Sequence, residues 1–230
     1  YKNIPAKSDI PKEEALKLIR GYRACVSYAD AQVGKIMAEL KKLGLDKNTV
    51  VVLLGDHGWS LGDHNQWCKH SNFNIVNNAP LIIKVPGNQK KGAEPKVVEF
   101  VDVYPTLCEA VGLPVPHHTE GESMMKLMTG EDKSWKDCAI IKWHSGVTYF
   151  DRDYGYTQWN DKAGNFQGHM LFLYRNDHLE TKNVADAPEN KEIVAQLQKE
   201  ILARRGKDFM KQVPKADKPE RKGTQAHKRK

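Results

Sequence analysis

Side chains that can bind metals follow directly after one apolar stretch of the sequence. Residues 49–54 read TVVVLL, and Gly55, Asp56, His57 and Gly58 come next. The Asp56 carboxylate is a hard oxygen ligand of the kind that calcium and magnesium prefer, and His57 adds an imidazole nitrogen or a hydrogen-bond donor. Two adjacent ligands cannot complete a metal site, so further ligands must come from other loops. The triplet alone is weak evidence because its residue types are common in turns.

A lysine and two tryptophans lie in the loop that follows this triplet. Trp59 and Trp67 stand between Asp56 and Lys69. A lysine ammonium is a compact point charge that can hold an oxyanion, and the indole rings could wall a pocket. A metal ion and a lysine together stabilise negative charge on a phosphoryl or sulfuryl group during its transfer. The stretch therefore predicts a site that handles an anion, without naming the reaction.

Two short apolar runs are predicted to form the strands that position this site. Residues 49–54 have the continuous apolar pattern of a strand covered on both faces, as in a parallel sheet with helices on either side. Residues 81–85 (LIIKV) are predicted to form another strand of the same sheet. In open α/β sheets, ligands bind just outside the carboxyl ends of the strands, which is where the DHG triplet falls.

Three helices and a small sheet complete the predicted architecture. Helical periodicity predicts helices over 11–43, 102–111 and 189–205, with Gly44 ending the first. Short runs separated by turn residues predict a small antiparallel sheet, with strands at 139–143, 147–150, 155–159 and 170–174 and a hairpin turn at 161–165. The order of elements indicates an α/β layer architecture followed by a small α+β unit.

The formal net charge of +7 is concentrated at the C-terminus. Residues 206–230 hold nine Lys or Arg and three Asp or Glu, which is +6, and we expect them to be a basic, disordered, solubilising tail. No stacking aromatics or recognition motif accompany this charge, so no nucleic-acid partner is expected. No apolar stretch approaches the roughly 20 residues of a membrane-spanning helix, so no membrane partner is expected either.

The four cysteines are not spaced like zinc ligands. Cys25 and Cys108 fall on the apolar faces of predicted helices, so we expect both to be buried free thiols. The cysteines therefore neither indicate nor exclude an oxidising compartment.

The stretch around the DHG triplet resembles the sulfatase family of the alkaline phosphatase-like superfamily. Three features carry the likeness: DHGWSLGDH after a strand, W-x-K at 67–69, and SNF at 71–73 leading to PLI at 80–82. The helix sequence at 21–40 and the segment FVDVYPTLCEAVGLPVP at 100–116 are also similar to the family. The likeness covers most of residues 15–187.

The resemblance implies a fold and its division. The chain is expected to form the C-terminal part of an alkaline phosphatase-like α/β sandwich, followed by a smaller C-terminal α+β subdomain with a short antiparallel sheet and a helix. The expected boundaries are 1–115 for the part of the catalytic domain, 116–205 for the subdomain and 206–230 for the basic tail.

The resemblance also implies roles for particular residues. Asp56 and His57 would bind one calcium ion, completed by ligands outside this chain. Lys69 corresponds to the lysine that binds the sulfate group, and His57 and Lys69 are the predicted catalytic residues. The residues expected to contact the substrate beside Lys69 are Trp59, His70 and Arg152.

The nucleophile of a sulfatase is missing from this sequence. Sulfatases use a formylglycine made from Cys or Ser in a C/S-x-P-x-R motif, and no such motif occurs here. The chain is therefore expected to be the C-terminal portion of a sulfatase, to need the N-terminal half as its partner, and to be inactive alone. The implied substrate is a sulfated carbohydrate, such as a uronate in a glycosaminoglycan, and the implied location is extracytoplasmic: periplasmic, secreted or lysosomal.

Two alternatives stay open. A phosphodiesterase or phosphatase of the same superfamily also carries the DHG triplet, but generally uses two zinc ions. A catalytically inactive binding fragment would keep the fold without the chemistry. One calcium ion in the complete protein would favour the sulfatase.

Overall fold

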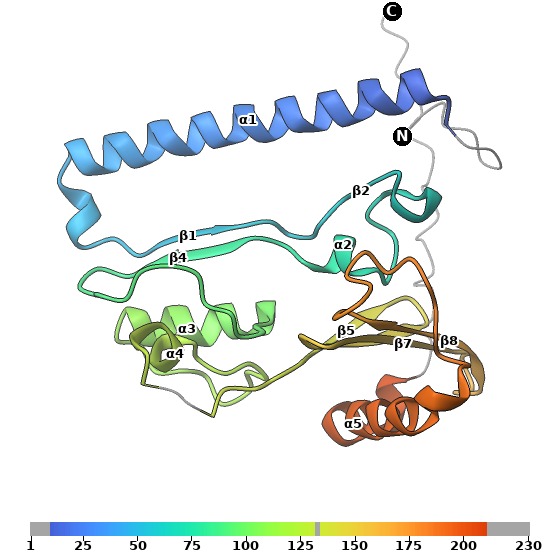
Figure 1. The fold of residues 1–230 in the computed structure, drawn as a ribbon. Helices are drawn as coiled ribbons and strands as arrows, with labels where there is room; N and C mark the ends of the chain where they lie inside the picture. The colour runs from blue at the N-terminus through green and yellow to red at the C-terminus, as the bar shows by residue number, and fades with distance from the viewer. Residues whose placement is uncertain (1–9, 132–133, 211–230) are drawn as a thin grey trace, which may run out of the picture.

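The computed structural model describes residues 10–131 and 134–210, and its first element is the long helix α1 (Lys12–Lys42) (Figure 1). Glu13 and Glu14 lie in its first turn, where the positive end of the helix dipole stabilises carboxylates. Gly44 follows the helix with a φ of 70°, the left-handed conformation that commonly ends helices. The helix predicted over 11–43 is confirmed, and the turn η1 (Leu45–Lys47) leads on to the first strand.

The strands β1 (Val51–Leu54) and β4 (Leu81–Lys84) form a two-stranded antiparallel ribbon. This corrects the predicted parallel sheet. A parallel neighbour needs a crossover connection, whereas this chain turns back and pairs Leu54 with Leu81. The prediction that β1 is covered on both faces is also wrong for this chain, since Leu53 is 39% and Leu54 44% exposed.

The connection between these strands contains four short elements that the sequence did not predict. The strands β2 (Ser60–Leu61) and β3 (Trp67–Cys68) pair antiparallel around the 3₁₀ turn η2 (Asp63–Asn65), and the helix α2 (Asn74–Asn77) follows. Strands of two residues and a helix of four are too short to show a periodic pattern, so their existence depends on tertiary contacts.

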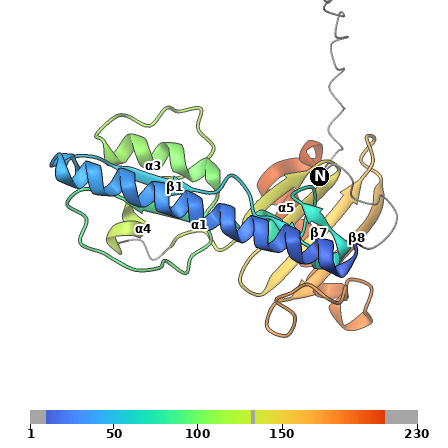
Figure 2. The same ribbon diagram turned by 90° about the horizontal axis from the view of Figure 1, so that it is seen from above.

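A second group of elements follows β4. The turn η3 (Phe100–Asp102) leads into α3 (Val103–Ala110), which confirms the helix predicted over 102–111, and α4 (Met125–Thr129) comes later. Figure 1 shows α3 and α4 on one side of the β1–β4 ribbon and α1 on the other, and Figure 2 shows α1 running along β1. A hydrophobic cluster in this part, packed on side chains from β4 and α3, contains the buried residues Met124, Leu127 and Trp135.

A buried group of charges fixes the start of α3. Asp102 is 0% exposed and accepts the backbone N–H groups of Glu99 (2.8 Å) and Glu122 (3.0 Å). Lys136 Nζ lies 2.6 Å from Asp102 Oδ2 and 2.8 Å from Glu99 Oε2. Because an unpaired charge is costly in the interior, Lys136 allows the Asp102 carboxylate to lie there, and Glu99 is also paired with Arg205 at 3.5 Å.

The C-terminal half forms a four-stranded antiparallel sheet in the order β5-β6-β7-β8. Its strands are β5 (Ala139–Trp143), β6 (Gly146–Phe150), β7 (Tyr154–Asn160) and β8 (Phe166–Leu173). The predicted antiparallel sheet is confirmed. The predicted turn at 161–165 is also confirmed, with the Asp161 carboxylate accepting the N–H groups of Ala163 and Asn165 at 2.8 Å.

The last helix, α5 (Lys191–Phe209), follows the turn η4 (Pro188–Asn190) and covers one face of this sheet. The largest fully buried side chains of this interface include Tyr156, Leu171 and Ile201. Gly206 interrupts the helix with a φ of 71°, so the regular part ends at 205, as predicted for the helix over 189–205.

Two expectations about exposure need correction. The predicted tail begins at Gly206, but Met210 is buried and Phe209 packs on the core under the Lys142 ammonium, so the first residues of that segment belong to the fold. The rest of the predicted tail lies outside the described residues. Cys108 is buried as expected, whereas Cys25 is exposed because no residue of α1 is buried.

Within the described ranges, no helix has the length and apolar character needed to cross a membrane.

Candidate active site

The DHG loop is held at both of its glycines by the segment around α2. The Gly55 N–H donates to the Pro80 carbonyl (2.9 Å), and the Gly58 N–H donates to the Val76 carbonyl (2.7 Å). A Cβ added to Gly58 would collide with the Ile75 carbonyl oxygen, so only glycine allows α2 to approach this closely. The two candidate metal ligands between the glycines are thereby fixed just beyond the end of β1.

Asp56 and His57 face each other at this position. His57 Nε2 lies 3.2 Å from Asp56 Oδ2, and His57 Nδ1 lies 2.8 Å from the Gly58 carbonyl oxygen. A carbonyl oxygen only accepts, so Nδ1 carries the proton in that hydrogen bond and Nε2 is turned toward the carboxylate. The Asp56 side chain is 80% exposed and that of His57 is 25% exposed. The carboxylate is therefore open to a ligand, while its neighbours orient the ring.

These two residues fit one side of a metal site. The 3.2 Å between Asp56 Oδ2 and His57 Nε2 allows both atoms to bind one cation at the roughly 2.3–2.6 Å typical of calcium. Calcium prefers oxygen, so Asp56 is the stronger ligand, and it takes about six to eight ligands in all. The described part of the chain contains no group of three or more His, Cys, Asp or Glu that could hold a metal. The remaining ligands would have to come from elsewhere.

A cavity of about 720 Å³ opens beside the DHG loop. Asp56, His57 and Arg152 all line it, although Arg152 comes from the connection between β6 and β7. Other ionisable side chains on its wall are Lys96, Glu99, Asp151, Tyr174, His178 and Arg205. The structure thus brings one predicted substrate residue into the same space as the predicted metal ligands, with a carboxylate for a cation and a guanidinium for an anion.

The other three predicted site residues are not among those that line this cavity. Trp59 stacks on the His57 ring, with 5.9 Å between the ring centroids. Lys69 is exposed just beyond β3. His70 meets the Trp143 ring edge-on at 5.1 Å, at the end of β5. The structure therefore joins Trp59 to the DHG loop and places His70, the residue after Lys69, against the antiparallel sheet.

A buried asparagine docks the segment after Lys69 onto this sheet. Asn72 is 6% exposed and donates to the Thr148 hydroxyl at 3.1 Å and to the Gly146 carbonyl at 3.4 Å. A Cβ on Gly146 would lie 2.6 Å from the Asn72 amide oxygen. Glycine at this position of β6 therefore leaves room for the Asn72 side chain. This contact links the DHG half of the chain to β6.

A buried glutamate makes a second link. Glu180 is 5% exposed and accepts the Asn74 backbone N–H and the Tyr174 hydroxyl, both at 2.7 Å. Burial raises the pKa of the Glu180 carboxyl, while these two hydrogen bonds oppose the rise. Asn74 begins α2, which carries the carbonyl that binds Gly58. Glu180 therefore positions the DHG loop through α2.

Sequence reasoning missed both of these supports. Asn72 stands in the SNF segment without an evident role, and Glu180 lies in a polar stretch that reads as an exposed turn. The unusual feature of Glu180 is its φ of 58°, which is rare for a side chain of this kind and becomes visible only in the folded backbone.

The close approach at Gly58 yields a stability prediction. Gly58→Ala should lower the free energy of unfolding by about 1–3 kcal/mol, the usual cost of overpacking, because the new methyl group collides with the Ile75 carbonyl. Denaturant unfolding measures the change. The matched control is Gly34→Ala in α1, where a Cβ meets nothing within 4 Å, and it should be stabilising by up to about 1 kcal/mol. Equal stabilities for the two variants would contradict the packing at Gly58.

Two protein families match the sequence. One is described as "Sulfatase" and matches residues 1–113. The other is described as "N-sulphoglucosamine sulphohydrolase, C-terminal" and matches residues 62–207, which is more than half of the chain. The chain belongs to the sulfatase family. The family resemblance predicted from the DHG region is confirmed.

Individual relatives of this sulfatase chain agree with that assignment. Iduronate 2-sulfatase of Mus musculus is 35% identical over 132 residues, which cover 46% of this chain and 24% of that protein. An arylsulfatase of Clostridium perfringens is 28% identical over 214 residues, which cover 87% of this chain and 43% of that protein. The chain thus spans less than half the length of these two relatives.

The fold also matches a known sulfatase-like structure. The crystal structure of a proposed sulfatase from Bacteroides fragilis superposes with a TM-score of 0.76 and 24% identity, covering 91% of this chain and 48% of that chain. The predicted fold class, an alkaline phosphatase-like α/β fold with a small antiparallel sheet and a C-terminal helix, is confirmed.

Proposed function

We propose that the protein containing this chain is a sulfatase that hydrolyses a sulfate ester on a sugar, and that this chain supplies part of its metal and sulfate site. The observation that carries the proposal is the Asp56–His57 pair, which stands at the end of β1 and opens into a cavity with Arg152. That pair occurs in a chain whose family matches extend over residues 1–207.

The proposed roles follow the chemistry of the side chains. Asp56, with His57 beside it, would hold a calcium ion, which supplies positive charge near the sulfate oxygens when bound. Lys69 would bind the sulfate group as a point charge, and Arg152 would bind an acidic group of the sugar. Trp59 and His70 would contact the sugar, and the stack of Trp59 on His57 supports a place for it beside the metal pair.

The nucleophile is proposed to come from residues outside this chain. The sequence contains no C/S-x-P-x-R motif, so it offers no site for a formylglycine of the sulfatase type. The described residues supply the electrostatic part of the site, and we expect the isolated 230-residue chain to have no sulfatase activity. The domain boundary at 115/116 also stays a prediction.

The proposed substrate is a sulfated carbohydrate. Similarity to iduronate 2-sulfatase supports a sulfated uronate, as found in glycosaminoglycans, and the guanidinium of Arg152 suits its carboxylate. An extracytoplasmic location is proposed because such polymers are found there.

A comparison of two proteins tests the proposal. The complete protein should hydrolyse an aryl sulfate and a sulfated uronate disaccharide and should contain one calcium ion by elemental analysis, whereas the isolated chain should hydrolyse neither ester. Two zinc ions together with turnover of a phosphate diester, and no sulfate release, would overturn the proposal in favour of a phosphodiesterase.

A further inference from the structure

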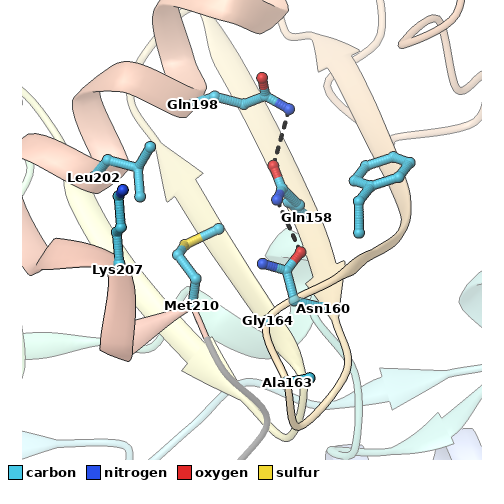
Figure 3. A pocket seen from close by; sticks show the side chains of 9 residues that line it. Gln158, Asn160, Ala163, Gly164, Gln198, Leu202, Lys207 and Met210 are labelled. Atoms are coloured by element: carbon cyan, nitrogen blue, oxygen red, sulfur yellow. Dashed lines mark hydrogen bonds between the residues drawn. The ribbon is translucent and has the colours of Figure 1, made fainter.

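A second cavity lies on the face of the antiparallel sheet that α5 covers. It has a volume of about 610 Å³ and opens between the β7–β8 hairpin and the end of α5 (Figure 3). The residues that line it are Gln158, Asn160, Ala163, Gly164, Phe166, Gln198, Leu202, Lys207 and Met210. None of them belongs to the candidate active site.

The segment after the DHG loop and the second cavity contact opposite faces of β7 and its neighbours. Side chains alternate between the faces of a strand. Thr157 of β7 bonds to Thr148 (2.9 Å), which in turn holds Asn72 next to the active-site half of the chain. The neighbouring Gln158 points the other way and accepts a hydrogen bond from Gln198 of α5 at 2.9 Å. The two cavities share no lining residue, although Arg205 of α5 lines the cavity beside the DHG loop and Lys207 of the same helix lines the second one.

A row of amides forms the polar wall of this cavity. Gln198 donates to Gln158, and Gln158 donates to Asn160 at 2.8 Å, as the dashed lines in Figure 3 show. Gln198 also donates to the hydroxyl of the buried Tyr156 at 2.9 Å, which fixes its orientation. The row is thus ordered before any ligand arrives.

The row has spare hydrogen-bonding capacity at both ends. Asn160 uses its amide oxygen to accept from Gln158, and no described residue accepts from its nitrogen. Gln198 uses its nitrogen twice, and no described residue donates to its oxygen. An amide nitrogen donates two hydrogen bonds and an amide oxygen accepts two, so both a donor and an acceptor remain for a ligand.

The other walls of the cavity are apolar, with one cation. The Phe166 ring is 53% exposed and stands edge-on to His169 at 5.2 Å, and Leu202 and Met210 add further apolar surface. Among the described residues that line the cavity, Lys207 is the one with a charge. A fixed donor and acceptor beside an exposed ring match a sugar, which has hydroxyls that both donate and accept and a C–H face that packs on aromatic rings.

We propose that this cavity is a second carbohydrate-binding site, which takes an anionic saccharide unit with its sulfate or carboxylate near Lys207. The proposal rests on the proposed function, because the ligand would be another unit of the same sulfated polymer. A purely apolar ligand would leave the amides unsatisfied, which is costly. Binding of one unit in this cavity raises the effective concentration of the rest of the polymer at the reactive site. A substrate too short to reach both sites has no such increase in affinity.

Binding of a heparin-derived octasaccharide, measured by calorimetry, tests the proposal. The measurements use the complete protein with Asp56→Asn, so that turnover does not interfere. Two changes are made in that background: Lys207→Gln removes the cation, and Asn160→Asp replaces the free donor with a negative oxygen while keeping the acceptor for Gln158. Each should raise the Kd by roughly tenfold, the effect of losing one hydrogen bond to a charged group.

The control is Lys199→Gln, an exposed lysine of α5 that does not line the cavity. It should leave the Kd unchanged, and aryl sulfate turnover should be unchanged when the Lys207 and Asn160 substitutions are made alone in the wild-type protein. A Kd that is unaffected by both cavity substitutions, or that Lys199→Gln raises equally, would overturn the second site. Absence of aryl sulfate turnover in the wild-type protein would instead count against the proposed function, because the binding measurement does not depend on hydrolysis.

Discussion

Replacing Asp56 by asparagine should lower sulfate-ester turnover by the complete protein by roughly 10²- to 10³-fold, the loss typical of removing one preorganised charge-stabilising group. The Asp56 side chain is 80% exposed and faces His57 Nε2 at 3.2 Å, so the substitution keeps the shape of the loop. It removes the negative charge that attracts a hard cation. Initial rates with an aryl sulfate, together with the calcium content of the same samples, measure the effect.

Asp63→Asn is the matched control for this experiment. Asp63 lies in the β2–β3 hairpin that follows the DHG loop, and its carboxylate accepts the Leu61 N–H at 3.0 Å, a bond that an asparagine oxygen also makes. Turnover and calcium content should therefore stay at the wild-type level. An Asp56→Asn protein as active as Asp63→Asn would show that Asp56 is not a metal ligand.

Replacing Lys136 by methionine should lower the free energy of unfolding by about 3–5 kcal/mol, the cost of breaking a buried ion pair from one side. Lys136 Nζ contacts Asp102 at 2.6 Å and Glu99 at 2.8 Å, and Asp102 is fully buried. Methionine fills similar space but leaves the buried Asp102 carboxylate without a cation, whereas Glu99 keeps Arg205 at 3.5 Å. Denaturant unfolding of the protein at neutral pH measures the loss.

The exposed lysine of α1 provides the comparison. Lys17 lies 2.9 Å from Glu14, but its side chain is 57% exposed. Water and salt screen such a pair, so Lys17→Met should leave the unfolding midpoint unchanged. If Lys136→Met lowered the free energy of unfolding no more than Lys17→Met, the prediction would be wrong. Water would then have to reach the Asp102 carboxylate.

Elements with a strong local pattern were predictable from the sequence. The helix α1 repeats its apolar residues at helical spacing and ends at a left-handed Gly44, and these properties belong to neighbouring residues. The strands between 139 and 173 alternate around turn residues, and the Asp161 turn is closed by its own side chain. In both cases the chain segment carries the information without help from distant residues.

The pairing of β1 with β4 was not predictable in the same way. A continuous apolar run shows that a strand avoids water, but it does not show in which direction its neighbour runs. That direction depends on the hairpin and α2 between the strands, which are held by Gly58 against Val76 and by Glu180 against Asn74. These contacts join residues up to 106 positions apart, so no local pattern records them.

In the candidate site, too, some features follow from the sequence and others from tertiary packing. Asp56 and His57 could be read from their order along the chain, because adjacent residues in a tight turn at the end of a strand are necessarily close together. Which other side chains lie near that pair depends on packing. Arg152, from the other half of the chain, lines the same cavity as Asp56 and His57. Lys69 follows them in the same loop but does not line the cavity. Spacing along a chain limits distance only over a few residues, and beyond that the buried contacts of Asn72 and Glu180 determine which side chains meet.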